Sequence, residues 1–391
     1  MGVRRLSELD LAGKRVLVRV DFNVPLDDEL RVTSDARIRR ALPTIEAIVT
    51  RGGRPILMSH LGRPKGKVVE RMRLRPAATR LAELLGRPVQ TTNDCVGEAV
   101  EKAAAELKDG QCLLLENLRF HAEETKGDAS FARQLARLGD VYVNDAFGTA
   151  HRAHTSVVGI AKHLPSAAGL LMERELRAFS KILEAPQRPL VAVLGGAKVS
   201  DKLPVLTHLL EKVDVLVIGG AMAYTFLAAA GLGVGKSLCE RSLVAQAAAI
   251  RERAKARNVE LLLPVDHLCA ATFGGVPEPP CGPAIPDHLM GLDIGPKTIE
   301  CFKEAVRSAK TVIWNGPMGV FENPAYRGGT EAIAVAVADN AGFSVVGGGD
   351  SVAAVELLGV VDRIDHVSTG GGASLELLEG RLLPGVAAVS T

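Results

Sequence analysis

The chain has 391 residues, more than one hydrophobic core usually supports, so two domains are the expected organisation. Hydrophobic residues make up 47%, charged residues 24% and aromatic residues 4% of the sequence, which is typical of a globular protein and excludes a fibrous or low-complexity chain. The net charge is +2, but residues 1–170 carry +6 and the remainder −4, which favours an anionic ligand for the first half.

Short apolar runs recur in the first half, each followed by a longer segment of helical period. Stretches such as 80–85 and 98–108 are amphipathic and indicate crossover helices. Runs that are apolar throughout, rather than alternating, predict strands buried on both faces of a parallel sheet. The runs are RVLVRV (15–20), PILMSH (55–60), CLLLEN (112–117) and VYVNDA (141–146).

The second half repeats this alternation, which predicts a second parallel sheet with right-handed crossovers. Its runs are LVAVLGG (190–196), VLVIGG (215–220), LLLPVD (261–266), TVIWNG (311–316) and FSVVGGG (343–349). Between the halves, the segment 172–190 reads as a charged helix ended by Pro186 and Pro189. The predicted fold class is therefore α/β, with two Rossmann-like open parallel-sheet domains joined by a hinge helix.

The six cysteines form no CxxC pair and no metal-ligand spacing, so reduced and mostly buried thiols are expected. The N-terminal segment contains no secretory signal, and no apolar run reaches the length that crosses a membrane. Both observations predict a cytoplasmic protein.

Polar side chains follow the predicted strands of the first half, and arginines lie near four of the strand ends. The arginine side chain binds carboxylates and phosphates through two parallel hydrogen bonds, so four such residues predict a pocket for a small, multiply charged anion. A solvated surface arginine is the simpler interpretation for any one of them, and it is the one we give to Arg71, Arg73 and Arg75. The candidate residues are Asp21, Asn23, Arg37, His60, Arg63, Arg119 and Arg152.

In the second half the strands end in glycines. LGGAKVSDK (194–202) follows a strand directly, where a Gly-Gly turn allows close approach of a ligand and a following helix offers N–H groups to phosphate. Lys198 and Lys202 are four residues apart and are expected on one face of that helix, where they would be either phosphate ligands or solvated lysines. In GGGDS (347–351), the Asp350 carboxylate could hold Mg²⁺ bridged to nucleotide phosphates, or could cap a helix.

The stretch AGLGVGKS (230–237) ends like a Walker A loop, but Ala230 stands where the first glycine is required and no strand leads into it. We interpret it as a loop without a phosphate-binding role. No GxGxxG motif lies between a strand and a helix, which is evidence against a dinucleotide dehydrogenase.

Taken together, the motifs closely resemble those of the phosphoglycerate kinase family, in order and from about residue 3 to the end. They are RVDFNVPL (19–26), SHLGRP (59–64), LLENLRFHAEE (114–124), VNDAFGTAHRAHTS (143–156), LGGAKVSDK, WNGPMGVFE (314–322), GGGDS and STGGGASLELLEG (368–380). One stretch departs from the family: His288-Leu289, in the loop before MGLDIG (290–295), stands where Gly-Trp is common, and the segment 269–288 is proline-rich.

The resemblance implies an activity, a domain organisation and a set of site residues. The activity would be Mg²⁺-dependent reversible phosphoryl transfer from 1,3-bisphosphoglycerate to ADP, giving ATP and 3-phosphoglycerate, in a monomeric glycolytic kinase that bends about its hinge. Residues 1–170 would bind 3-phosphoglycerate with the tail 380–391 packed on them, 171–185 would be the hinge, and 186–379 would bind the nucleotide.

By position, 3-phosphoglycerate would bind to the seven residues named above for the first half. The phosphoryl group in transfer would be stabilised by Arg37, Lys198, Lys202 and the amides of Gly371 and Gly372, and Asp350 would hold Mg²⁺. The nucleotide would contact Gly196, Ala197, Lys198, Lys202, Gly219, Gly220, Leu292, Asn315, Pro317, Glu322, Gly349, Asp350 and Ser351.

Two alternatives remain from the residues alone. One is a different kinase or acyl-phosphate enzyme on the same scaffold. The other is a nucleotide- or nucleic-acid-binding protein without kinase activity, which the singly spaced arginines and few aromatics do not favour.

Overall fold

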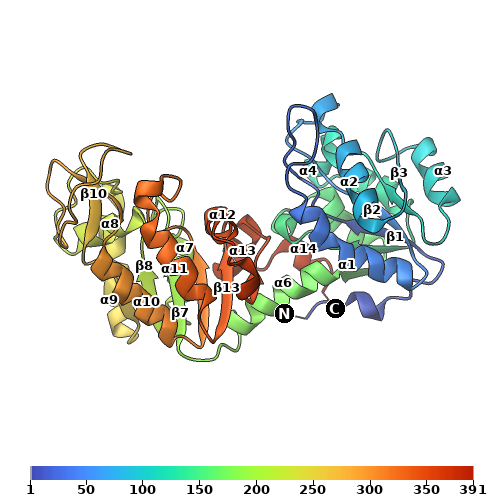
Figure 1. The fold of residues 1–391 in the computed structure, drawn as a ribbon. Coiled ribbons are helices and arrows are strands. Elements are labelled where there is room, and N and C mark those ends of the chain that lie inside the picture. Colours follow the sequence, from blue (N-terminus) through green and yellow to red (C-terminus); the bar gives the residue numbers. More distant parts are fainter. Residues whose placement is uncertain (1, 391) are drawn as a thin grey trace. The chain divides into compact units, whose positions relative to one another are not determined.

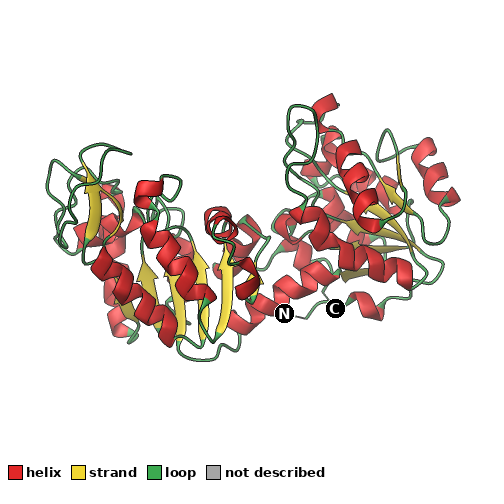
Figure 2. Cartoon of the chain, viewed as in Figure 1, coloured by secondary structure: helices red, strands yellow, loops and turns green. Residues whose placement is uncertain are grey.

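The computed structural model describes residues 2–390, and the chain forms two compact units (Figure 1). The first unit contains the residues up to Arg177 together with those from Leu382 onward, and the second contains Ala178–Arg381. The boundary lies within helix α6 (Leu170–Leu183). In each unit the strands form an inner layer covered by helices (Figure 2).

The first unit is built on a six-stranded sheet in the order β3-β4-β2-β1-β5-β6, in which every pairing is parallel. The strands are β1 (Arg15–Arg19), β2 (Arg54–Met58), β3 (Val89–Thr91), β4 (Cys112–Leu114), β5 (Val141–Asn144) and β6 (Ser166–Ala168). Four residues of β1 and four of β2 are buried, as expected for strands covered on both faces. Their carboxyl ends lie at one edge of the sheet because the strands are parallel.

Helices of the first unit present apolar residues to this sheet, and Ile38, Ile45 and Ile48 of α1 join the buried core formed by β1 and β2. They are α1 (Ala36–Thr50), α2 (Arg75–Leu85), α3 (Glu98–Glu106), α4 (Glu123–Lys126), α5 (Ala129–Ala136) and α14 (Pro384–Ala387). Short 3₁₀ turns η1 (Leu6–Glu8), η2 (Glu70–Met72), η3 (Leu118–Phe120), η4 (Phe147–Thr149) and η6 (Ile160–Lys162), and the π-helical turn η5 (Thr155–Gly159), connect them.

Helix α14, near the end of the chain, packs on the first unit. The Gly385 amide donates to the Ala150 carbonyl at 2.7 Å, and the Asn144 side chain donates to the Gly385 carbonyl at 3.4 Å. Val386 is buried at this contact.

The second unit has a six-stranded parallel sheet in the order β14-β13-β12-β7-β8-β9. Its strands are β7 (Leu190–Leu194), β8 (Val215–Ile218), β9 (Glu260–Leu262), β12 (Thr311–Asn315), β13 (Phe343–Gly347) and β14 (His366–Val367). Its helices are α7 (Leu203–Leu209), α8 (Met222–Ala229), α9 (Val244–Ala256), α10 (Pro296–Ser308), α11 (Gly328–Ala338), α12 (Gly349–Leu357) and α13 (Gly372–Leu378), with 3₁₀ turns η7 (Arg241–Leu243), η8 (Pro324–Tyr326) and η9 (Val361–Arg363). Trp314 of β12 is completely buried in the core.

The predicted α/β class with two parallel sheets is confirmed. The antiparallel pair β10 (His267–Ala270) and β11 (Met290–Ile294) was not predicted, because the proline-rich segment between them hides the strand pattern. The prediction of a helix over Lys198 and Lys202 is wrong: α7 begins only at Leu203, where Pro204 occupies the first turn. None of the helices formed by residues 2–390 is both long and apolar enough to cross a membrane.

Candidate active site

In the first unit, the polar residues singled out in the sequence lie beyond the carboxyl ends of β1, β2, β4 and β5, which are neighbours in the sheet. Strand order reverses here, since β2 lies on one side of β1 and β5 on the other. Ligands of open α/β sheets bind in the crevice at such a reversal.

The centre of this region is Arg19, the last residue of β1, which is 0% exposed. Its Nη2 lies 3.0 Å from Nδ1 of His60. A guanidinium only donates, so Nδ1 of His60 must be the acceptor and its proton must lie on Nε2. Burial, followed by the charges of Arg19 and Arg119, holds the pKa of His60 well below its ordinary value. His60 is therefore neutral at physiological pH and has an N–H to donate.

The charge of Arg19 is matched by a buried carboxylate. Arg19 Nε donates to Ser156 Oγ at 2.8 Å, and the Ser156 hydroxyl donates to Glu124 Oε1 at 2.6 Å. Glu124 also accepts from the Ser156 amide at 2.9 Å and is 0% exposed. A buried charge is tolerated when it is paired and hydrogen-bonded, so this relay holds Arg19 in place.

Two further arginines increase the positive charge. Arg119 is half-buried and donates to the Gly62 carbonyl at 2.8 Å, while Arg152 is exposed. Burial, together with the charges of Arg19 and Arg152, lowers the pKa of Arg119 to about 10. Burial and the same group of arginines lower the pKa of His154 to about 4. A site that disfavours further positive charge so strongly is suited to bind an anion.

The remaining predicted residues lie beside this cluster, in loops and at the start of α1. Arg37 opens α1, is exposed, and pairs with Asp21 at 2.5 Å. Asn23 accepts from the Gly62 amide at 2.9 Å, which joins the loops after β1 and β2. Arg63 is exposed. Sequence reasoning missed Arg19 and His154; an arginine at the end of an otherwise apolar buried strand was the signal for the first.

The second unit contains a cavity of about 500 Å³ at the carboxyl ends of β7, β8 and β12. Strand order reverses here too, because β8 and β12 flank β7. Seven of the predicted nucleotide residues line it: Gly196, Ala197, Gly220, Leu292, Pro317, Glu322 and Asp350. The lining residues that sequence reasoning missed are Ala221, Tyr224, Lys236, Leu238, Phe273, Met290, Gly291, Met318, Gly319 and Val320.

Glycine turns form the floor of this cavity. The Gly196 amide donates to the Pro317 carbonyl and the Gly220 amide to the Met318 carbonyl, both at 3.0 Å. Gly220 has a φ of +65°, and a Cβ there would lie 2.5 Å from the Gly196 nitrogen. No larger residue fits at Gly220, so the turns that contain Gly196, Gly220 and Pro317 meet through backbone atoms alone. Gly219 lies behind this floor, against Met318.

Lys202 lies just before α7, and its Nζ donates to the side-chain oxygen of Asn315 at the end of β12. Burial lowers the pKa of Lys202 to about 8, although the nearby carboxylates Asp201 and Asp350 act in the opposite direction. The lysine is thus a partly desolvated cation with a hydrogen-bonded head group. Lys198 lies in the bend between β7 and α7.

The two remaining glycine segments begin helices. Gly349 and Asp350 are exposed in the first turn of α12, whereas Ser351 is buried and its hydroxyl accepts from the Gly316 amide at 2.6 Å. Gly371, with a φ of +50°, precedes α13, which begins at Gly372. Six of the predicted nucleotide residues do not line the cavity: Lys198, Lys202, Gly219, Asn315, Gly349 and Ser351. Gly371 and Gly372 do not line it either, whereas Asp350 does.

Comparison with known proteins identifies the family. The family model described as phosphoglycerate kinase matches residues 6–381. The chain is 57% identical to the phosphoglycerate kinase of Anaeromyxobacter sp. (strain K) over 393 residues, covering 99% of both chains. It is 58% identical to that of Moorella thermoacetica over 387 residues, covering 98% of both. The chain belongs to the phosphoglycerate kinase family.

Solved structures of the phosphoglycerate kinase family have the same fold. The enzyme from Coxiella burnetii superposes with a TM-score of 0.91 at 40% identity, covering 99% of this chain and 98% of that one. The enzyme from Pyrococcus horikoshii OT3 superposes with a TM-score of 0.84 at 34% identity, with the same coverage.

Membership of the phosphoglycerate kinase family confirms the predicted activity: the chain is a glycolytic, nucleotide-binding kinase with a carboxyl group as acceptor. The prediction for 230–237 was that it forms a loop, and it does, with a single bridge between Val234 and Ile285. Lys236 of that loop nevertheless lines the cavity. The local motif did not predict this position, because the loop reaches the cavity only through the fold of the second unit.

Proposed function

We propose that the first unit binds 3-phosphoglycerate or 1,3-bisphosphoglycerate, that the second binds ADP or ATP, and that the phosphoryl group passes directly between them. The observation that supports this most strongly is the division of chemistry between the two sheets. One sheet ends in arginines and neutral histidines around Arg19, and the other ends in glycine turns with Lys202 beside them.

In the first unit, Arg37, Arg63, Arg119 and Arg152 would bind the phosphate and carboxylate groups, and His60 would donate its Nε2 proton to an oxygen of the substrate. Asp21 and Asn23 would position these donors, since Asp21 pairs with Arg37 and Asn23 holds the loop that precedes Arg63. A carboxylate acceptor is already an anion, so the reaction needs no general base.

In the second unit, the adenine would lie against the apolar wall of the cavity, near Leu292 and Gly220, with Glu322 toward the ribose. The Gly196 turn and the amides at the start of α12 would face the phosphates. Ser351 would contribute through its amide, because its side chain is 0% exposed and turned toward the Gly316 amide, from which it accepts. Asn315 would act through Lys202. Pro317, Ala197, Gly219 and Gly349 would shape the backbone.

Asp350 is the residue we propose for Mg²⁺. Its carboxylate is exposed, lines the cavity and lies in the first turn of α12, and carboxylate oxygen is a ligand that Mg²⁺ prefers. When bound, Mg²⁺ would neutralise charge on the nucleotide phosphates. Lys202, Lys198, Arg37 and the amides of Gly371 and Gly372 would stabilise the phosphoryl group in transfer, which is mainly a matter of positioning and charge.

The nucleic-acid alternative receives little support from the surface. A hollow of about 1170 Å³ in the first unit is lined by several arginines, but most of them are paired with carboxylates. Arg39 and Arg80 both bind Asp35, and Arg73 binds Glu70. We further propose a monomer, from the family resemblance, and a cytoplasmic location, which the six free cysteines support.

The experiment that tests the proposal is ATP formation from 1,3-bisphosphoglycerate and ADP, with and without Mg²⁺. Separate titrations of 3-phosphoglycerate and ADP distinguish the two sites. Arg119→Lys should weaken 3-phosphoglycerate binding and leave ADP binding unchanged, because one bidentate donor is lost in the first unit only. Equal weakening of 3-phosphoglycerate binding and ADP binding would contradict the assignment.

Closure of the chain about residues 172–190 during the reaction stays a prediction.

We expect Asp350→Asn to raise the Mg²⁺ concentration that gives half-maximal activity by about tenfold or more, because an amide offers a weaker ligand than a carboxylate. The measurement is activity against free Mg²⁺ at saturating substrates. Glu356→Gln, in the same helix, serves as the matched control. An unchanged Mg²⁺ requirement in Asp350→Asn would place the metal elsewhere.

We expect kcat/KM for ADP to be constant below about pH 8 and to fall above it. The pKa of Lys202 in the free chain is lowered to about 8 by burial, and the ammonium form is the one that stabilises the phosphoryl group. As the pH rises through this value the free chain loses the proton, and kcat/KM should fall toward tenfold per pH unit. The measurement is a pH–rate profile at saturating 1,3-bisphosphoglycerate and ADP concentrations well below KM. Lys202→Arg should be less active but should lack this fall, and a fall that persists in that variant would assign it to another group.

A further inference from the structure

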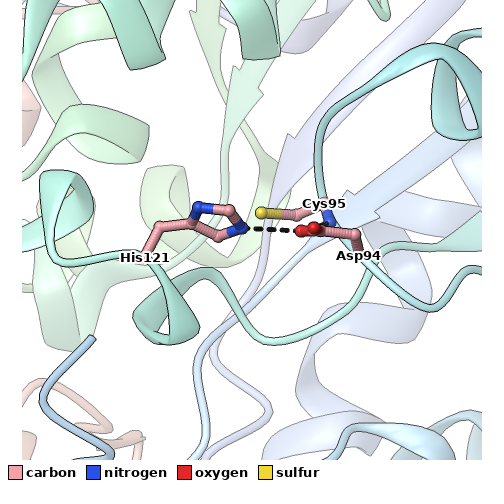
Figure 3. Close-up of side chains that lie close together, drawn as sticks. All are labelled: Asp94, Cys95 and His121. Carbon is pink, nitrogen blue, oxygen red and sulfur yellow. Dashed lines mark hydrogen bonds and ion pairs between the residues drawn. The ribbon is translucent and has the colours of Figure 1, made fainter. Parts of the chain in front are cut away.

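We propose that Asp94, Cys95 and His121 of the first unit form a binding site for Zn²⁺, distinct from the groups that bind substrate. One ligand atom from each residue lies within 4.8 Å of the other two. Figure 3 shows the sulfur, the carboxylate and the imidazole pointing toward one another from two different loops. It is the one such group of three or more potential ligands among residues 2–390.

The fold brings these residues together at one edge of the sheet. Asp94 and Cys95 follow β3, and His121 directly follows η3 after β4. β3 and β4 are parallel neighbours, so both loops leave the same edge of the sheet. The Asp94 carbonyl accepts from Thr92 Oγ1 at 2.6 Å, which holds the first loop.

The ring of His121 is also held in place. It stacks on Phe131 with ring centroids 5.0 Å apart, and its Nε2 donates to Asp94 Oδ1 at 2.6 Å. The same carboxylate oxygen accepts from the Cys95 amide at 2.6 Å. The two loops therefore bring the three side chains together before any ion binds, and binding would replace the hydrogen bond between His121 and Asp94 by contacts to the ion.

The donor set selects the kind of metal. A thiolate, an imidazole and a carboxylate are the ligands of Zn²⁺, whereas Mg²⁺ prefers oxygen alone. The thiolate and carboxylate together carry two negative charges, which balance the ion.

The site is open on one side. Cys95 is 0% exposed, but the side chain of Asp94 is 53% exposed and that of His121 is 28% exposed. An ion can enter past these two residues, and water can complete a tetrahedral set as the fourth ligand. For such a set the ligand atoms lie roughly 3.3–3.6 Å apart. Rotation of the exposed Asp94 side chain opens the 2.6 Å hydrogen bond to this spacing.

Binding changes the protonation of two ligands. The S–H bond of Cys95 breaks as the S–Zn bond forms, and its proton passes to water. The imidazole proton moves from Nε2 to Nδ1 through solvent, so that the Nε2 lone pair binds the ion. One proton is therefore released for each ion bound. Since η3 carries Arg119, the bound ion would also fix the segment that presents this arginine to substrate.

Co²⁺ titration of the full chain, with Mg²⁺ present in excess, tests the site. We expect one Co²⁺ per chain, with visible bands of tetrahedral intensity and a near-ultraviolet thiolate-to-cobalt charge-transfer band, all bleached by Zn²⁺. Cys95→Ser should remove the charge-transfer band, whereas Cys301→Ser, at an exposed cysteine, should leave it unchanged. His121→Gln should weaken Co²⁺ binding by ~100-fold or more, since loss of an outer contact alone costs 10- to 100-fold. His163→Gln, an exposed histidine, should not.

The same titration defines the results that would overturn the proposal. One is the absence of a thiolate band in the wild-type chain, which is the result expected if Cys95 is a core thiol beside an Asp–His hydrogen bond. Another is a band that survives Cys95→Ser. If Cys95→Ser does not fold, the test rests on His121→Gln and Asp94→Asn, which should fold because both side chains are partly exposed. Unchanged Co²⁺ binding in both variants would exclude the site.

Discussion

Replacing Lys202 by alanine is expected to lower kcat about 10²- to 10³-fold. The Nζ of Lys202 is held by Asn315 and partly desolvated, so its charge is poorly screened and needs no reorganisation when the phosphoryl group passes. Removing one preorganised donor of this kind costs about 3–4 kcal/mol of transition-state stabilisation. The measurement is steady-state turnover at saturating 1,3-bisphosphoglycerate and ADP.

The KM values and a matched variant distinguish catalysis from binding. The cavity is formed largely by backbone and apolar side chains, so the KM for ADP should change by less than about tenfold in Lys202→Ala. Lys255→Ala removes an exposed lysine of the same unit, in α9, and its kcat should match the wild type. A Lys202→Ala enzyme with normal kcat would remove Lys202 from the phosphoryl-transfer step.

Replacing Arg19 by methionine is expected to destabilise the first unit by about 3–5 kcal/mol. Arg19 and Glu124 are both 0% exposed and joined through Ser156, so the variant leaves a buried carboxylate without its cation. His60 also loses the donor that fixes its tautomer, so 3-phosphoglycerate binding should weaken. The measurement is urea unfolding followed by far-ultraviolet circular dichroism.

The chain offers two controls for this experiment. Arg15 lies on the same strand but pairs with Asp140 at a partly exposed position. Arg15→Met should therefore lower the free energy of unfolding by only about 1 kcal/mol or less. The single tryptophan, Trp314, is in the second unit, so its fluorescence should change at nearly the wild-type urea concentration in both variants.

A double variant tests the cause. Glu124→Gln combined with Arg19→Met removes both charges and should recover part of the lost stability. A double variant as unstable as the sum of the two single ones would mean that the two charges are not coupled.

Much of this protein was predictable from the sequence alone. Apolar runs alternating with helical segments predicted two parallel sheets, because strands buried on both faces need apolar residues at every position. The same pattern located strand ends, and the carboxyl ends of parallel strands are where ligands bind. Residues such as Arg119 and Gly220 are therefore candidates from their positions in the sequence, and the ordered motifs indicate the family.

Only the tertiary structure decided which residues meet. Arg19 looked like part of an apolar strand, yet the fold places its guanidinium on His60, 41 residues away, and fixes the proton of that ring. Lys236 and Tyr224 reach the cavity, and His121 reaches Asp94, through strand order and register. Periodicity reports which face of an element is buried, but contacts between distant elements depend on how the sheets are ordered, and the local sequence pattern carries no record of that order.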